Sequence, residues 1–116
     1  MKKRKIIAKI YKKTFIEASE IEKIILKKAL NNIDSIKSYN IEIPTTEIKK
    51  DLIVDDEEII NAVTDLYERF RHLCFYKKNI FKYVTFMIYA GISSERITII
   101  FDKKITKYII KNTTKK

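Results

Sequence analysis

The chain has few of the residues on which most catalytic and cofactor-binding motifs depend. Its 116 residues include one glycine, one proline, one cysteine, one histidine and no tryptophan. Nucleotide-binding loops of the GxGxxG and GxxxxGK types need at least two glycines, and only Gly91 is present. A structural zinc site needs four Cys or His ligands, whereas Cys74 and His72 are the whole supply. These scarcities predict a protein that is not an enzyme and that uses no cofactor or metal.

Long apolar runs are also missing. The longest, residues 80–92, is too short to cross a membrane and is interrupted by Lys82. The basic start at residues 1–5 resembles that of a signal peptide, but lysines interrupt the apolar stretch that should follow it. A single cysteine allows no internal disulfide, which is typical of a reducing compartment. We therefore expect a cytoplasmic protein with no membrane partner.

The remaining composition favours one folded domain. Apolar residues make up 46% of the chain and aromatic residues 11%, which suffices for a hydrophobic core although 34% of the residues are charged. A chain of this length buries roughly two-thirds of the surface that it exposes when unfolded. No linker rich in glycine, serine or proline divides it. We expect a single domain over residues 1–116, with flexible segments at 1–5 and 111–116.

Basic residues exceed acidic ones, and the two kinds are segregated along the chain. The net charge is +10, from 25 Lys and Arg against 15 Asp and Glu. Residues 1–16 carry seven bases and no acid, residues 33–60 carry eight acids and three bases, and residues 61–116 carry twelve bases and four acids. An excess of positive charge of this size most often serves to bind a polyanion, so it favours a nucleic-acid partner.

Hydrophobic periodicity predicts mostly helices in the first half of the chain. The expected elements are a helix or a strand at 4–16, a helix at 17–31, a strand at 38–43 and a helical turn from 45 to 53. Ser19 and Glu22 have the spacing of a capping box at the start of the second of these elements.

The longest predicted helix covers residues 56–77. Asp55 or Asp56 can cap its start. Its apolar residues recur at spacings of three and four: Ile59, Ile60, Val63, Leu66, Tyr67, Phe70, Leu73 and Cys74. The pattern predicts that Cys74 is a small core residue and that His72 is exposed.

Residues 80–101 (IFKYVTFMIYAGISSERITIIF) place the only glycine between two apolar segments and directly before Ile-Ser-Ser-Glu-Arg-Ile. A helix that ends at Ala90, turns at Gly91 and restarts at a serine cap fits this pattern. Over about residues 80–102 the chain resembles the helix-turn-helix motif of DNA-binding proteins. Met87 departs from that motif, which usually has a small residue at this position.

The resemblance implies a mainly α-helical fold of the helix-turn-helix or winged-helix type. It also implies that five residues pack the two helices together: Phe86, Ala90, Ile92, Ile97 and Ile100. In such a fold Arg96 suits the two acceptors of a guanine, and serine hydroxyls at the helix start suit a phosphate. The predicted DNA-binding residues are Lys77, Lys78, Lys82, Ser93, Ser94, Glu95, Arg96, Thr98, Lys103, Lys104 and Lys107.

Two local alternatives change the contact residues. Residues 96–101 and 105–110 are β-branched and fit a β-hairpin, which in a winged-helix protein is the wing that contacts DNA, with Lys103 and Lys104 at its tip. Aromatic and basic residues interleave over residues 75–83, an arrangement that can stack single-stranded bases.

The sequence therefore predicts a small, basic, non-enzymatic protein that binds double-stranded DNA. Transcriptional control, plasmid or phage maintenance, and an accessory role in DNA processing on a mobile element all fit it. Proteins of this type commonly act as homodimers, and the helices at 21–29 and 59–74 offer surfaces for one. The alternative is a helical module that binds a partner helix in a groove and has no nucleic-acid role.

Overall fold

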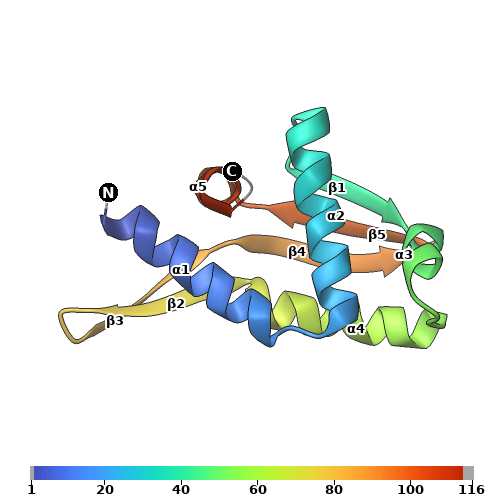
Figure 1. Cartoon of the computed structure of the whole chain (residues 1–116), viewed down its shortest axis with the longest axis horizontal. Coiled ribbons are helices and arrows are strands. Elements are labelled where there is room, and N and C mark those ends of the chain that lie inside the picture. Colours follow the sequence, from blue (N-terminus) through green and yellow to red (C-terminus); the bar gives the residue numbers. More distant parts are fainter. Residues whose placement is uncertain (1, 114–116) are drawn as a thin grey trace.

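The computed structural model describes residues 2–113 and contains both helices and strands in that range (Figure 1). In chain order the elements are α1 (Lys2–Glu17), α2 (Glu20–Ile36), β1 (Asn40–Pro44), α3 (Thr45–Asp51), α4 (Asp56–Phe70), β2 (His72–Lys77), β3 (Ile80–Thr85), β4 (Met87–Ser93), β5 (Arg96–Phe101) and α5 (Lys103–Thr113).

The strands form a three-stranded sheet and a separate two-stranded ribbon, both antiparallel. In the sheet, β5 lies between β1 and β4. Every second residue of β5 is buried, namely Ile97, Ile99 and Phe101, as expected for a strand with one covered face. Strands β2 and β3 pair only with each other, and we call them the ribbon. Helix α2 packs against β1, and α4 packs against β4.

Two tight turns connect strands without using glycine. Ser94 and Glu95 join β4 to β5 with φ of 52° and 62°, and Lys78 and Asn79 join β2 to β3 with φ of 54° and 66°. Two consecutive residues with positive φ are typical of the type I′ turn that matches the twist of a hairpin. Gly91 instead lies inside β4, where a Cβ atom would collide with the ring of Tyr89. The only glycine therefore makes room for an aromatic ring and makes no turn.

Two helix starts are fixed by the local signals that predicted them. At α2, Ser19 Oγ accepts a hydrogen bond from the N–H of Glu22, whose carboxylate accepts one from the N–H of Ser19. Asp55 and Glu58 form the same reciprocal pair at α4. Each pair satisfies backbone donors that a helix start leaves without intrahelical partners.

An aromatic cluster centred on Phe86 forms the middle of the core. Phe86 lies between β3 and β4 and is fully buried. The rings of Tyr11, Phe70 and Phe101 lie 5.7, 6.1 and 5.2 Å from its ring, centroid to centroid. These rings come from α1, α4 and β5, so the contacts of Phe86 hold these three elements together.

A partly buried ion pair joins α2 to α4. Arg69 Nε donates to Glu22 Oε1 at 2.9 Å, and the glutamate is only 2% exposed. The hydrogen bond to Glu22 raises the pKa of Arg69, so the guanidinium stays charged. Because a buried carboxylate without a partner is costly, this pair fixes how the two helices meet.

The mainly α-helical fold class predicted from the sequence is wrong, and the fold mixes helices with antiparallel sheet. Residues 80–102 form no helix-turn-helix: they are β3, β4 and β5. Pairing of β4 with β5 across a two-residue turn satisfies the backbone groups and buries alternate residues of β5, which a helix here would not do. The alternative of a hairpin between 96–101 and 105–110 is also wrong. Residues 96–101 are a strand, but it pairs with β4 and β1, and residues 105–110 belong to α5, with Ile105 and Ile109 buried one turn apart.

The predicted helix at 56–77 is also too long. It ends at Phe70, and the chain continues as β2, where Leu73 and Phe75 are buried and Cys74 between them is exposed. His72 is half-buried, with its ring 4.5 Å from that of Tyr83. The helical faces expected to support a dimer point into the core, since the apolar residues that define them are mostly buried: Ile25, Leu26, Ala29, Ile59, Val63, Leu66 and Phe70.

The two segments predicted to be flexible are partly helical. Residues 2–5 belong to α1 and residues 111–113 to α5, while residues 1 and 114–116 lie outside the described residues. Within the described range, no helix is long and apolar enough to cross a membrane.

One buried polar atom lacks a partner. The hydroxyl of Thr106 in α5 is fully buried and has no hydrogen-bond partner among the described residues. We expect Thr106→Val, which keeps the shape and removes the hydroxyl, to raise the free energy of unfolding by about 1 kcal/mol. Urea denaturation followed by circular dichroism measures this. Thr106→Ser, which keeps the hydroxyl and opens a small void, should be destabilising; a valine variant that is equally destabilised contradicts the assignment.

Candidate nucleic-acid interface

Three elements that are far apart in the sequence pack together and carry most of the basic residues. Helix α1 packs against both α5 and β2 (Figure 1). The sequence of α1 holds seven Lys or Arg residues and one acid, Glu17. The ribbon with its turn holds three lysines, α5 holds four, and neither has an acid. We call α1, α5 and the ribbon the basic half.

Acidic residues gather at the opposite end of the molecule. The long axis measures 44 Å, and Figure 1 shows the ribbon turn at one end, with α3 and the β4–β5 turn at the other. A hydrogen bond from the N–H of Thr45 to the carbonyl of Glu95 joins this second group. The acids of this end are Glu42, Glu47, Asp51, Asp55, Asp56, Glu57, Glu58 and Glu95. Charge segregation along the sequence thus becomes charge segregation in space.

A cleft between the end of α2 and one face of α5 concentrates positive charge. Its volume is about 470 Å³. The cationic lining consists of Lys37, Lys103, Lys107 and Lys111, with Asp34 as the one acid. The three lysines of α5 are four residues apart and so share one helix face. We call this the cationic cleft; four ammonium groups against one carboxylate suit a phosphate-rich ligand.

The start of α5 carries charge of the sign that a helix start disfavours. Its first turn contains Lys103 and Lys104 and no acid, although the backbone N–H groups there form the positive end of the helix dipole. Asp102, just before the helix, accepts a hydrogen bond from the N–H of Ile105 and offsets part of this cost. Lys103 and Lys104 therefore do not stabilise α5 through the helix dipole.

The ribbon combines basic residues with an exposed aromatic face. Lys77 and Lys78 lie at its turn. On one face, Phe75 packs toward α1 with Lys82 opposite it, and both line a small hollow together with Ile6. The other face carries two ring pairs, His72 with Tyr83 at 4.5 Å and Tyr76 with Phe81 at 5.5 Å. Tyr76, Phe81 and Tyr83 are each more than half exposed.

The structure divides the predicted DNA-binding residues between the basic half and the acidic end of the molecule. Lys103, Lys104 and Lys107 lie on α5, and Lys77, Lys78 and Lys82 lie on the ribbon, so six of the eleven belong to the basic half. The other five, Ser93, Ser94, Glu95, Arg96 and Thr98, lie in the β4–β5 hairpin at the acidic end.

Arg96 is therefore not on a recognition helix. It begins β5, and its guanidinium lies 3.8 Å from the carboxylate of Glu42 on the neighbouring strand. Ser93 and Ser94 likewise mark a strand end and a turn, so they offer no helix start to a phosphate. Lys103 and Lys104 open a helix and do not form the tip of a wing. The basic tip belongs to the ribbon, at Lys77 and Lys78.

Sequence reasoning missed Lys37 and Lys111 as members of the cationic cleft. Lys37 follows α2 in a left-handed conformation, with φ of 61°, and meets α5 only through the tertiary fold. The spacing of Lys103, Lys107 and Lys111 was a usable signal, because it repeats at one helical turn, but only once residues 103–113 are known to be helical.

No metal centre is evident in the part of the chain that the structure describes. No group of three His, Cys, Asp or Glu side chains is placed to hold a metal ion there. Comparison of the chain with protein-family models, with curated proteins and with solved structures finds no match. The candidate site therefore rests on its own geometry.

The charge at the start of α5 gives a stability prediction. We expect Lys103→Glu/Lys104→Glu to raise the free energy of unfolding by about 0.5–1 kcal/mol at low salt, because acids favour the positive end of the helix dipole. Urea denaturation at low and high salt measures the effect, which should shrink as salt screens it. The matched control is Lys111→Glu in the last turn, where the same exchange should destabilise. Equal shifts in both variants would contradict the dipole explanation.

Proposed function

We propose that the protein binds double-stranded DNA through its basic half and catalyses no reaction on it. The observation that carries the proposal is the packing of α1, α5 and the ribbon into one region with fourteen basic residues and one acid. Neutralising phosphates releases condensed counterions, so such a region binds a polyanion strongly at low salt. Lysines kept at an unfavourable helix start support the same use of α5.

Each part of the basic half has a separate role in this proposal. The cationic cleft and the exposed lysines of α1 hold phosphates and set the position of the duplex. The ribbon is of the size that a major groove admits, and Lys77 and Lys78 at its turn would lead it there. This ribbon replaces the helix-turn-helix as the element that enters a groove. Cytoplasm is the compartment we propose, because the exposed thiol of Cys74 stays free where the environment is reducing.

A second candidate is single-stranded nucleic acid, which the exposed aromatic face of the ribbon favours. Aromatic side chains stack on bases of any sequence, and the nearby lysines would follow the backbone. Tyr76, Phe81 and Tyr83 are the exposed rings available for this. Two observations distinguish duplex from single strand as the ligand. One is which of the two binds the protein with higher affinity, and the other is whether substitution of the rings or of the lysines lowers that affinity more.

The test is fluorescence anisotropy of a labelled duplex and of its single strand at low and near-physiological salt. We expect Lys103→Glu/Lys107→Glu and Lys77→Glu/Lys78→Glu each to weaken duplex binding about tenfold or more at low salt. Each should also lower the slope of log affinity against log salt by about two, because two phosphate contacts are lost. Lys50→Glu/Arg96→Glu, the same charge change at the acidic end, is the control and should bind nearly as the wild type does.

Three outcomes would contradict the duplex proposal. The first is an equal loss of affinity in the control variant, which would assign binding to net charge alone. The second is preference for the single strand together with loss of binding in Tyr76→Ala/Tyr83→Ala, which would favour the stacking candidate. The third is no measurable binding of either form at low salt.

A further inference from the structure

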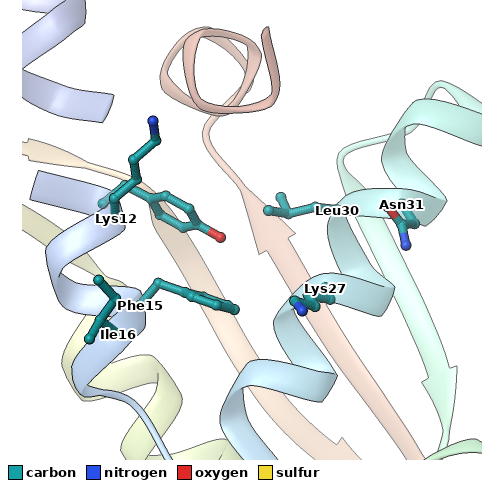
Figure 2. Close-up of a pocket in the computed structure, with 7 residues that line it drawn as sticks. Lys12, Phe15, Ile16, Lys27, Leu30 and Asn31 are labelled. Carbon is teal, nitrogen blue, oxygen red and sulfur yellow. The ribbon is translucent and has the colours of Figure 1, made fainter. Parts of the chain in front are cut away.

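An apolar groove between α1 and α2 shares only Lys12 with the DNA-binding surface proposed above. The two helices meet at residues 18–19 and diverge from there (Figure 1). The groove between them has a volume of about 450 Å³. Figure 2 shows Phe15 reaching from α1 toward Lys27 on α2, and Leu30 reaching back from α2. No acidic residue lines it; the lining residues are Tyr11, Lys12, Phe15, Ile16, Lys27, Leu30 and Asn31.

The rim of this groove is cationic and its floor offers a hydrogen bond. Lys23 and Lys27 each place their ammonium group 5.8 Å from the centroid of the Phe15 ring, and Lys12 lines the α1 side. Tyr11 is 5% exposed and lines the same groove. Burial raises the pKa of Tyr11, so its hydroxyl keeps its proton and can donate. The groove therefore suits an apolar side chain flanked by carboxylates and backbone carbonyls.

A segment with that chemistry is present at the acidic end of the same chain. The loop between α3 and α4 exposes Ile53 fully, more than any other large hydrophobic residue among those described. The acids around it are Asp51, Asp55, Asp56, Glu57 and Glu58, all exposed. Lys28 pairs with Asp51 at 2.9 Å and Lys49 pairs with Asp56 at 2.6 Å. The other three acids form no ion pair among the described residues, although Asp55 and Glu58 each accept one backbone hydrogen bond in the capping box of α4. We call residues 52–58 the acidic tip.

We infer that the acidic tip of one molecule docks in the α1–α2 groove of a second copy, with Ile53 in the groove and acidic side chains facing Lys12 and Lys27. The tip does not occupy the groove of its own molecule, because Ile53 is fully exposed. Tip and groove are different surfaces, so the contact is heterologous and each copy has one of each. This association would extend head to tail, and it does not rest on DNA binding.

Sedimentation velocity over a range of concentrations tests this, at low and high salt with reductant present. We expect wild-type protein to form a concentration-dependent series of oligomers that shrinks at high salt. Ile53→Asp, which changes the tip, and Lys12→Glu/Lys27→Glu, which changes the groove, should each weaken association at least tenfold. The controls are Ile36→Asp, another exposed isoleucine, and Lys13→Glu/Lys50→Glu, both of which should associate as the wild type does.

Mixing the two defective variants gives the sharpest outcome. Ile53→Asp keeps an intact groove and Lys12→Glu/Lys27→Glu keeps an intact tip, so the mixture should form one-to-one dimers and nothing larger. A wild-type protein that stays monomeric, or a mixture that stays monomeric, overturns the inference. If Lys12→Glu/Lys27→Glu loses association while Ile53→Asp keeps it, the groove binds a different segment and the role of the tip is overturned. Anisotropy with the duplex, run on Ile53→Asp, separates this result from the DNA-binding proposal.

Discussion

The packing around Phe86 is the constraint on which the rest of the structure depends. Its ring contacts those of Tyr11, Phe70 and Phe101, while its backbone N–H donates to Arg71 and its carbonyl accepts from Asp102. These contacts hold α1, the end of α4, and the chain just before α5 around one residue at the base of the ribbon. Helices α1 and α5 and the ribbon are rich in lysine and repel one another. The apolar core holds them together, because burial of its side chains supplies more favourable free energy than this repulsion costs.

The sequence allowed confident prediction only where a signal was local. The capping box at Ser19 and the cap predicted at Asp55 or Asp56, found at Asp55, mark true helix starts, and alternation before Pro44 marks β1. The region after Phe70 failed because its aromatic and β-branched residues suit either structure, and because both tight turns lack the glycine that usually identifies a hairpin. A bulge between Met87 and Tyr89 also breaks the alternation of β4, so both Ile88 and Tyr89 are exposed.

The candidate site was predictable in composition and not in position. Basic residues at both ends of the chain anticipated α1 and α5, but only the tertiary fold brings Lys37 to α5 and takes Arg96 to the acidic end. Two local costs fall on the basic half: lysines at the start of α5 and the unpaired hydroxyl of Thr106. Natural sequences tend to tolerate such costs where an element has a task besides folding.

Separation of charge along a 44 Å axis gives the molecule a large permanent electric dipole moment. The field of a polyanion exerts a torque on this dipole, so the molecule turns before any contact forms and approaches with its lysine-rich end leading. Productive encounters are then a larger share of collisions than for an evenly charged protein of the same net charge. A molecule that approaches a polyanion in this orientation keeps its acidic end, which exposes Ile53, toward the solvent.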